Sequence, residues 1–399
     1  MGARMQEHGS DAAFGLLCRM VAPRPDLDGL RAALREGVDV GAVLLAAADH
    51  GVRPLLIRTL SRAGWVGIPE GVREGLRAFQ REHQARVLAA TEALGELSRR
   101  LAARGVDILV FKGAALAALL HRDPAAREFN DIDILVAHDH VETASDVLVA
   151  LGYGISISEE RVRRAFFAHQ RQFAFTRHDT ATIDLHWDFT AEHVPFPLSV
   201  ADAWRSATEI SLGRHRVRTI DGDALALLLA GHGTKEAWRS LSWVCDFAML
   251  LEGGGSIDWR ALHRRAAAAG CGDALLLSCV MAERLLGVPV PADLAVEARS
   301  RRRVGDLASS MIAGLSEVDT GHELRPHLVD LQLHDSAWRR AVATLRIGLR
   351  PSVGDYRAMP LPAPLWPVYR LTRPVRLAAG AVRGASGRWR RSKGRSRAD

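Results

Sequence analysis

The spacing of apolar side chains divides the chain into helical, alternating and again helical parts. In residues 1–104 apolar positions recur three and four residues apart, and the pattern from Glu74 to Arg104 is the longest, with charged residues along its outer face. We interpret these helices as a layer that covers one side of a sheet, in preference to a source of catalytic groups.

Short strand-like runs are concentrated in residues 105–220. They lie at 107–111, 131–136, 153–158, 172–176 and 181–189, and helical patterns occur between them at 114–121, near 140–151 and at 159–168. The turn at 178–180 predicts a hairpin between the last two runs. Strands mixed with helices in this order predict an α+β fold with a small mixed sheet.

The run 181–189 should have two different faces, because successive side chains of a strand point to opposite sides. One set is apolar and the other polar: Ile183, Leu185, Trp187 and Phe189 on one face, Asp184, His186 and Asp188 on the other. The polar face therefore combines carboxylates with an imidazole.

Residues 221–350 return to helical spacing. We expect Asp223 to cap a helix, a polar and aromatic helix to run through 231–251, a helix pair to break at Gly270, and another helix to span 338–349. Residues 351–367 are rich in proline, and the basic tail after Gly380 is predicted to be disordered. We therefore expect an N-terminal helical region (1–104), a mixed core (105–220), a C-terminal helical domain (221–350) and a terminal segment (351–399).

The composition is typical of a soluble globular protein, with 48% hydrophobic and 25% charged residues. No apolar run reaches the roughly 18 residues that a membrane helix needs, and the N-terminus lacks the order of a signal peptide. Four cysteines show no metal-ligand spacing. We expect these cysteines to be buried free thiols and the protein to be cytoplasmic.

The net charge of +7 comes mainly from the end of the chain. Residues 357–399 hold eleven Lys or Arg and a single acid, which leaves 42 basic and 45 acidic residues in the rest. The body is therefore slightly acidic, which does not favour a broad nucleic-acid surface. Nucleic acid is expected as a partner only through the tail or as the acceptor of a reaction.

Asp131-Ile132-Asp133 is the strongest chemical signal. In a strand, Asp131 and Asp133 project side by side, and because their charges repel, such a pair usually binds a divalent metal. A bare Asp-x-Asp could instead end and cap a loop with no metal. Gly113 at a strand-to-helix turn, with Lys112 beside it, favours the metal, because the combination is typical of a phosphate-plus-metal site.

The order Lys112-Gly113, then Arg127, then Asp131-Ile132-Asp133 resembles the signature of poorly characterised bacterial nucleotidyltransferases of the DNA polymerase beta superfamily. The resemblance extends to about residue 375, but its specific part is short. Better-known members carry Gly-Gly-Ser or Gly-Ser where this chain has Lys112-Gly113-Ala114. The hydroxyl that often meets a nucleotide phosphate is therefore absent.

The resemblance implies a two-metal site for nucleotidyl transfer. Asp131 and Asp133 would hold Mg²⁺ or Mn²⁺, and Asp184 would be the third metal ligand and can act as base on the acceptor hydroxyl. Lys112 and Gly113 would hold the triphosphate of an NTP co-substrate.

Two further residues each have two interpretations. Arg127 either reaches the triphosphate or braces the Asp-x-Asp loop through a bidentate pair with a carboxylate. His186 either orients the acceptor or packs as an ordinary histidine.

The segment 231–251 is expected to close the site from the other side. If it is one helix, His232, Lys235 and Arg239 lie near one face. We expect His232 and Lys235 to contact phosphate or base across a cleft. Trp238 and Trp243 are interpreted as packing residues.

The predicted function is transfer of a nucleoside monophosphate from an NTP to a hydroxyl or phosphate on a small molecule, a peptide or an RNA. A toxin-like enzyme that modifies transfer RNA is an alternative, but it predicts a basic groove on a body that is near neutral. The other alternative is a catalytically silent module that binds nucleotide or a partner. The missing hydroxyl after Gly113 supports it, and the three carboxylates oppose it.

Overall fold

The computed structural model describes residues 2–178, 180–191, 194–253, 255, 257–316 and 336–376. The tail after Gly380, predicted to be disordered, lies outside the described residues. Within them, no helix combines the length and the hydropathy that a membrane crossing needs. The four cysteines are buried and free, as predicted.

A small mixed sheet forms the centre of the fold and confirms the predicted α+β class. In the described part of the chain it has five strands in the order β1-β2-β5-β4-β3. Their bounds are β1 Leu109–Val110, β2 Asp131–Leu135, β5 Thr182–His186, β4 Gln172–Thr176 and β3 Gly154–Ile155. β2 and β5 are parallel and the other neighbours are antiparallel, including the predicted β4–β5 hairpin.

Helices connect and cover these strands. They are α5 Glu70–Ala102, α6 Gly113–His121, the 3-10 turn η1 His138–His140, α7 Val141–Ala150, α8 Glu160–His169 and α9 Val200–Arg205. A second hairpin, β6 Ala207–Leu212 and β7 His215–Ile220, packs against β1, α5 and α6. The sequence pattern did not predict this second hairpin.

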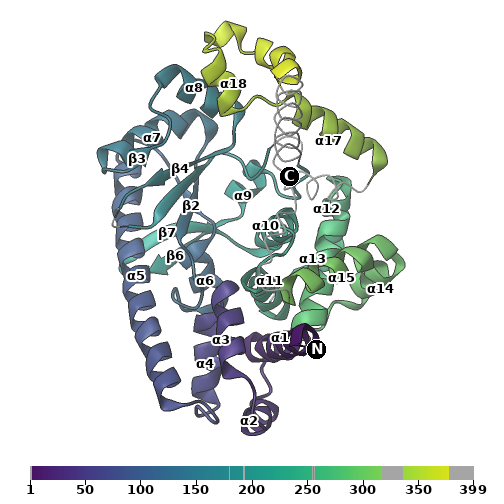
Figure 1. The fold of residues 1–399 in the computed structure, drawn as a ribbon. Helices are drawn as coiled ribbons and strands as arrows, with labels where there is room; N and C mark the ends of the chain where they lie inside the picture. The colour runs from purple at the N-terminus through teal and green to yellow at the C-terminus, as the bar shows by residue number, and fades with distance from the viewer. Residues whose placement is uncertain are drawn as a thin grey trace, which may run out of the picture.

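Other helices precede and follow this core (Figure 1). Before it come α1 Gly2–Val21, α2 Leu27–Arg35, α3 Val40–Asp49 and α4 Arg53–Arg62. After it come α10 Gly222–Lys235, α11 Leu241–Gly253, α12 Trp259–Ala268, α13 Gly272–Leu286, α14 Ala292–Ser300, α15 Arg302–Ser316, α17 Ala337–Leu349, α18 Val353–Ala358 and the 3-10 turn η2 Ala363–Leu365.

Two apolar cores lie on either side of the sheet. One joins α5 and α7 to the strand residues Ile132 and Ile183, so the predicted covering layer is confirmed for α5. The other joins α1 and α4 to α10, α11 and α13, and it contains Leu17 and Leu56. Helices of the first and last regions therefore share one core, and Figure 1 shows α1 close to α11 and α13, across the molecule from α5. The four-region division of the chain stays a prediction.

Three local predictions are wrong. Phe189 lies in the second core, its ring centre 5.5 Å from that of Phe111, because β5 ends at His186. The cap of α10 is Asp221, whose side chain accepts from the Gly222 amide, whereas Asp223 pairs with Arg265 on the surface. The helix expected over 231–251 is broken between α10 and α11.

Candidate active site

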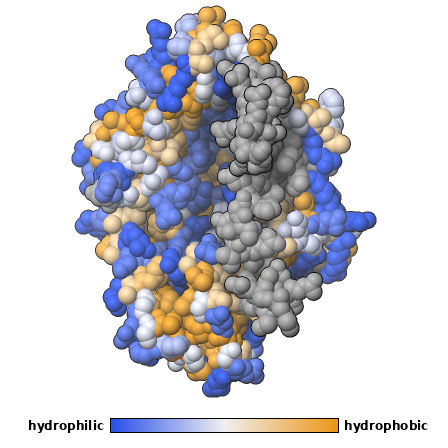
Figure 2. Space-filling view, viewed as in Figure 1, coloured by the Kyte–Doolittle hydropathy of each residue, from blue (hydrophilic) through white to orange (hydrophobic). Residues whose placement is uncertain are grey.

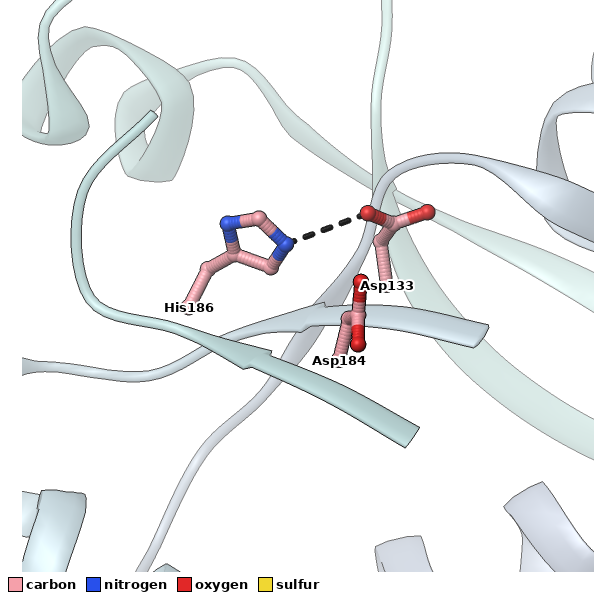
Figure 3. A group of neighbouring side chains, drawn as sticks. All are labelled: Asp133, Asp184 and His186. Carbon is pink, nitrogen blue, oxygen red and sulfur yellow. Dashed lines mark hydrogen bonds and ion pairs between the residues drawn. The ribbon is translucent and has the colours of Figure 1, made fainter. Parts of the chain in front are cut away.

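The register of β2 and β5 brings the carboxylates together. Asp133 pairs directly with Asp184 across these parallel strands, and Asp131 pairs with Thr182. Directly paired side chains lie on the same face of a sheet, so Asp133 and Asp184 face each other (Figure 3). Ile132 and Ile183, which precede these two aspartates along their strands, are buried on the opposite face.

Asp133 is the most buried of the three carboxylates, at 2% exposure. Its Oδ1 accepts from Lys112 Nζ at 2.9 Å and from His186 Nε2 at 3.1 Å. Burial by itself would raise the pKa of Asp133, but Lys112 and His186 outweigh it and hold that pKa well below its ordinary value. Asp133 is therefore a fixed negative charge at the centre of the site.

Asp131 and Asp184 differ from Asp133 in their electrostatics. Burial and the Asp133 charge raise the pKa of Asp131. Burial, then Asp133 and Asp131, raise the pKa of Asp184. Because the carboxylates repel one another, each further ionisation is disfavoured, and a bound cation would offset this excess of negative charge.

The donor atoms fit a divalent cation. Asp133, Asp184 and His186 offer ligand atoms that all lie within 4.8 Å of one another. Carboxylate oxygens suit Mg²⁺ and Mn²⁺, and an imidazole in the set also suits other transition metals. Asp131 is outside this close group but lines the same cavity.

The turn between β1 and α6 has the geometry expected for Lys112-Gly113. Gly113 begins α6 with φ +56°, in the left-handed region that favours glycine. Lys112 stands at the helix N-cap, and its side chain runs to Asp133. The residue predicted to touch phosphate thus lies on the carboxylate face of the sheet, where it is paired with a carboxylate.

Arg127 is paired with a carboxylate, though not one of the Asp-x-Asp loop. Its Nε donates to Asp246 Oδ2 of α11 at 2.9 Å, and both side chains are largely buried. His121 approaches the same carboxylate, with 3.8 Å between Nε2 and Oδ1. Arg127 also lines the cavity beside Asp131. The pair therefore ties the loop before β2 to the C-terminal helices.

His232 and Lys235 reach the site from the end of α10, but Arg239 does not share their helix. The helix ends at Lys235, and Ala237 and Trp238 have φ values of +55° and +50°. Trp238 is fully buried. Burial, then the Lys112 and Lys235 charges, lower the pKa of His232, so its imidazole is neutral at neutral pH.

These groups line a cavity of about 570 Å³. Among the described residues it is bounded by the carboxylates of β2 and β5, the end of α10 and the start of α11. Figure 2 shows hydrophilic side chains over the middle of the face that it displays. A concave, polar site of this size fits a nucleotide.

The comparison with known families agrees with this geometry. Residues 36–287, more than half of the chain, match the family described as "Uncharacterised nucleotidyltransferase". The chain belongs to this family. No curated protein matches it.

Two solved structures of ANT(2'')-Ia are distantly similar to this family member. The first is a crystal structure in complex with adenylyl-2''-tobramycin, 14% identical, covering 45% of this chain and 95% of that chain, with a TM-score of 0.33. The second is a solution structure of the same antibiotic-resistance factor, 13% identical, covering 45% and 89%, with a TM-score of 0.32. Scores this low carry no argument for function.

Sequence reasoning missed a group of cavity residues in this nucleotidyltransferase. Arg53 of α4 and His83 and Arg86 of α5 line the cavity from helices that were interpreted as a covering layer. Arg53 also pairs with Glu128, just before the Asp-x-Asp strand. The spacing of His83 and Arg86 puts them on one side of α5, but only the position of that helix shows that this side meets the site.

Proposed function

We propose that this protein transfers a nucleoside monophosphate from an NTP to an acceptor hydroxyl, with the help of divalent metal. The observation that carries the proposal is the direct cross-strand pairing of Asp133 with Asp184, beside Asp131, in one polar cavity. Membership of a nucleotidyltransferase family supports it. Placement within the bacterial branch of the DNA polymerase beta superfamily, and a cytoplasmic location, belong to the same proposal.

Asp133 and Asp184 would hold the metal, with Asp131 and His186 as further ligands. A bound Mg²⁺ or Mn²⁺ would offset the charge of the triphosphate and lower the pKa of the acceptor hydroxyl. Without it, Asp133 keeps its place through Lys112 and His186. Lys112 therefore serves as an internal counter-charge to Asp133.

Cations on several elements would hold the triphosphate. Lys112, Arg127 and Lys235 line the cavity, as do Arg53 and Arg86 from the N-terminal helices. Because α6 begins at Gly113, its N-terminal amides also favour an anion there. These contacts would take the place of the hydroxyl that Ala114 lacks.

The chemical step exchanges one phosphorus–oxygen bond for another. The acceptor oxygen bonds to the α-phosphorus, the bond from that phosphorus to the bridging oxygen breaks, and pyrophosphate leaves with the electron pair. The hydroxyl proton passes to Asp184, the carboxylate directly across the strands from Asp133. Asp133, with its lowered pKa, stays ionised and is unsuited to that role.

Pyrophosphate release with each of the four NTPs, with and without Mg²⁺, tests this function. Asp133→Asn and Asp184→Asn should each reduce metal-dependent release by about a hundredfold or more. Asp306→Asn on α15, where the side chain is exposed, is the matched control and should keep full activity. Unchanged turnover in both site variants would refute this site as the catalytic centre, and absence of metal-dependent release from the wild type with every NTP would leave a silent nucleotide-binding module.

A further inference from the structure

A second cavity opens beside the catalytic one, on the β4 side of the sheet. It has a volume of about 690 Å³ and is lined by residues of β4, α8, the chain after β5, and the region of α17 and α18. Gln172, Lys235 and Glu236 line both cavities, so the two spaces meet at these side chains. We call this space the β4 cavity.

The β4 cavity begins one strand away from Asp184. Ala174 of β4 lines it and is the direct cross-strand partner of Asp184. Neighbouring strands lie about 5 Å apart, so a molecule resting on β4 can bring a hydroxyl to the Asp184 carboxylate. Asp131 and Asp133 lie on the far side of β5, where the nucleotide is expected.

The charges around the β4 cavity are mainly positive. Among the described lining residues, Arg171, Lys235, Arg350 and Arg357 are basic and Glu236 is acidic. Two adjoining carboxylates pair with arginines: Asp188 lies 3.5 Å from Arg171, and Glu159 lies 3.2 Å from Arg357. Even with both included, these cations outnumber the carboxylates, four to three.

One wall of the β4 cavity is aromatic. Phe166 and Phe173 line this wall, and their rings pack edge to face with centres 5.1 Å apart, whereas Phe189 lines the cavity from the other apolar core. Arg350 lies near them and donates to the Gln170 side chain. A ligand with a flat or apolar body and an acidic group would match both parts of this wall.

We propose that the β4 cavity binds the acceptor and that the acceptor is a small anionic molecule. Its carboxylate or phosphate group is joined to an apolar or aromatic body, and this body carries the reacting hydroxyl. This inference rests on the proposed function and adds the substrate class. The anionic group lies near Arg350 and Arg357, and the hydroxyl points to Asp184. The same charges disfavour a polycationic acceptor.

Four probes of matched shape test the charge preference. They are para-hydroxyphenylacetate and para-hydroxybenzylphosphonate, which are anions, tyrosol, which is neutral, and tyramine, which is a cation. Binding to the full-length protein is measured by ligand-observed NMR without nucleotide. The anions should bind at least about tenfold more tightly than tyramine, and their relative affinities show whether carboxylate or phosphate is preferred.

Substitutions locate the bound anion. Arg350→Gln and Arg357→Gln should each weaken binding of the anions by about tenfold. Arg357 is exposed, so its variant should fold even if the other does not. Arg264→Gln on the exposed face of α12 is the control and should bind like the wild type.

Several results would overturn the inference: tyramine binding as tightly as the anions, neither anion binding, or both arginine variants keeping full affinity for them. Because binding is measured without nucleotide, a catalytically inactive centre would not abolish it. Failure of the proposed function and failure of this inference are therefore separate outcomes.

Discussion

At the scale of single residues, the site contains charges that oppose folding in the absence of metal. Asp184 lies directly opposite Asp133 and close enough to Asp131 for both to raise its pKa. Like charges that are directly opposite in a sheet are destabilising. Asp133 is different, because Lys112 and His186 compensate its charge.

Substitution of these two aspartates should therefore change stability in opposite directions. In metal-free buffer, Asp184→Asn should raise the free energy of unfolding by up to about 1 kcal/mol, because it removes the repulsion. Asp133→Asn should lower it by about 2 kcal/mol, because the Lys112 ammonium loses its ion pair. Urea unfolding monitored by circular dichroism measures both values.

The exposed Asp306→Asn variant should change the same quantity by less than about 0.5 kcal/mol. A stability loss in Asp184→Asn as large as that in Asp133→Asn would show that the two carboxylates are equivalent. It would contradict the electrostatic asymmetry described above.

A different residue-scale prediction concerns Gly113 and its φ of +56°. A Cβ at this position would meet the Asp131 carbonyl oxygen at 3.4 Å, which is an ordinary contact, so the cost of alanine comes from the backbone. Gly113→Ala should lower the free energy of unfolding by about 1–2 kcal/mol. Gly75→Ala, in α5 with open space around it and no positive φ, should instead be neutral or stabilising.

Local patterns were enough to predict some of these residues but not their partners. The period of two in a strand predicts that Asp131 and Asp133 lie side by side and that Asp184 shares a face with His186. The pair of Arg127 with Asp246 joins residues 119 positions apart. No local pattern reports a contact of that range, because it depends on how α11 packs against the sheet.

At the scale of elements, α6 links the turn at Lys112 and Gly113 to the interior of the molecule. It runs from Gly113 to His121, and the C-cap residue Arg122 adopts φ +56°. Glycine is the residue that most helices use at such a left-handed position, because a Cβ is disfavoured there. An arginine in this conformation leaves the helix end less stable than it could be.

Arg122→Gly should therefore raise the free energy of unfolding by about 0.5–1 kcal/mol, although glycine is a poor helix former elsewhere. Arg81→Gly is the matched control, because Arg81 is exposed within α5 and its replacement should cost about 1 kcal/mol. Denaturant unfolding of both variants gives the comparison. Destabilisation by both substitutions would show that the Arg122 side chain has a stabilising role that its backbone conformation does not reveal.

The end of α10 shows why some element boundaries were missed. Apolar spacing continues from α10 into α11, so the sequence predicts one helix. In the structure the Trp238 ring packs back against Gly233, where an added Cβ would lie 2.6 Å from the ring. The chain reverses through Ala237 and Trp238, and this tertiary contact overrides the local helical pattern.

At the scale of the whole molecule, helices from the two ends of the chain complete one core. α1 packs directly against α13, and Leu17 of α1 is fully buried in the core that also contains α10 and α11. The cavity has the same composite origin, since Arg53 and Lys235 line it from the two helical regions. Loss of the first helices should therefore affect the site as well as stability.

Leu17→Ala tests whether the two helical regions unfold as one cooperative unit. The void left by the shortened side chain should lower the free energy of unfolding by about 3 kcal/mol. If both helices open together, amide hydrogen exchange in α13 should accelerate by about a hundredfold. Leu88→Ala is the control, because Leu88 is 61% exposed on α5 and should leave exchange in α13 unchanged. Mass spectrometry of peptides from residues 272–286 and 141–150 separates the two cores. Unchanged exchange in α13 of the Leu17→Ala protein would mean that the N-terminal helices open independently of α13. Formation of the site cavity, which both helical regions line, would then require separately stable parts to dock.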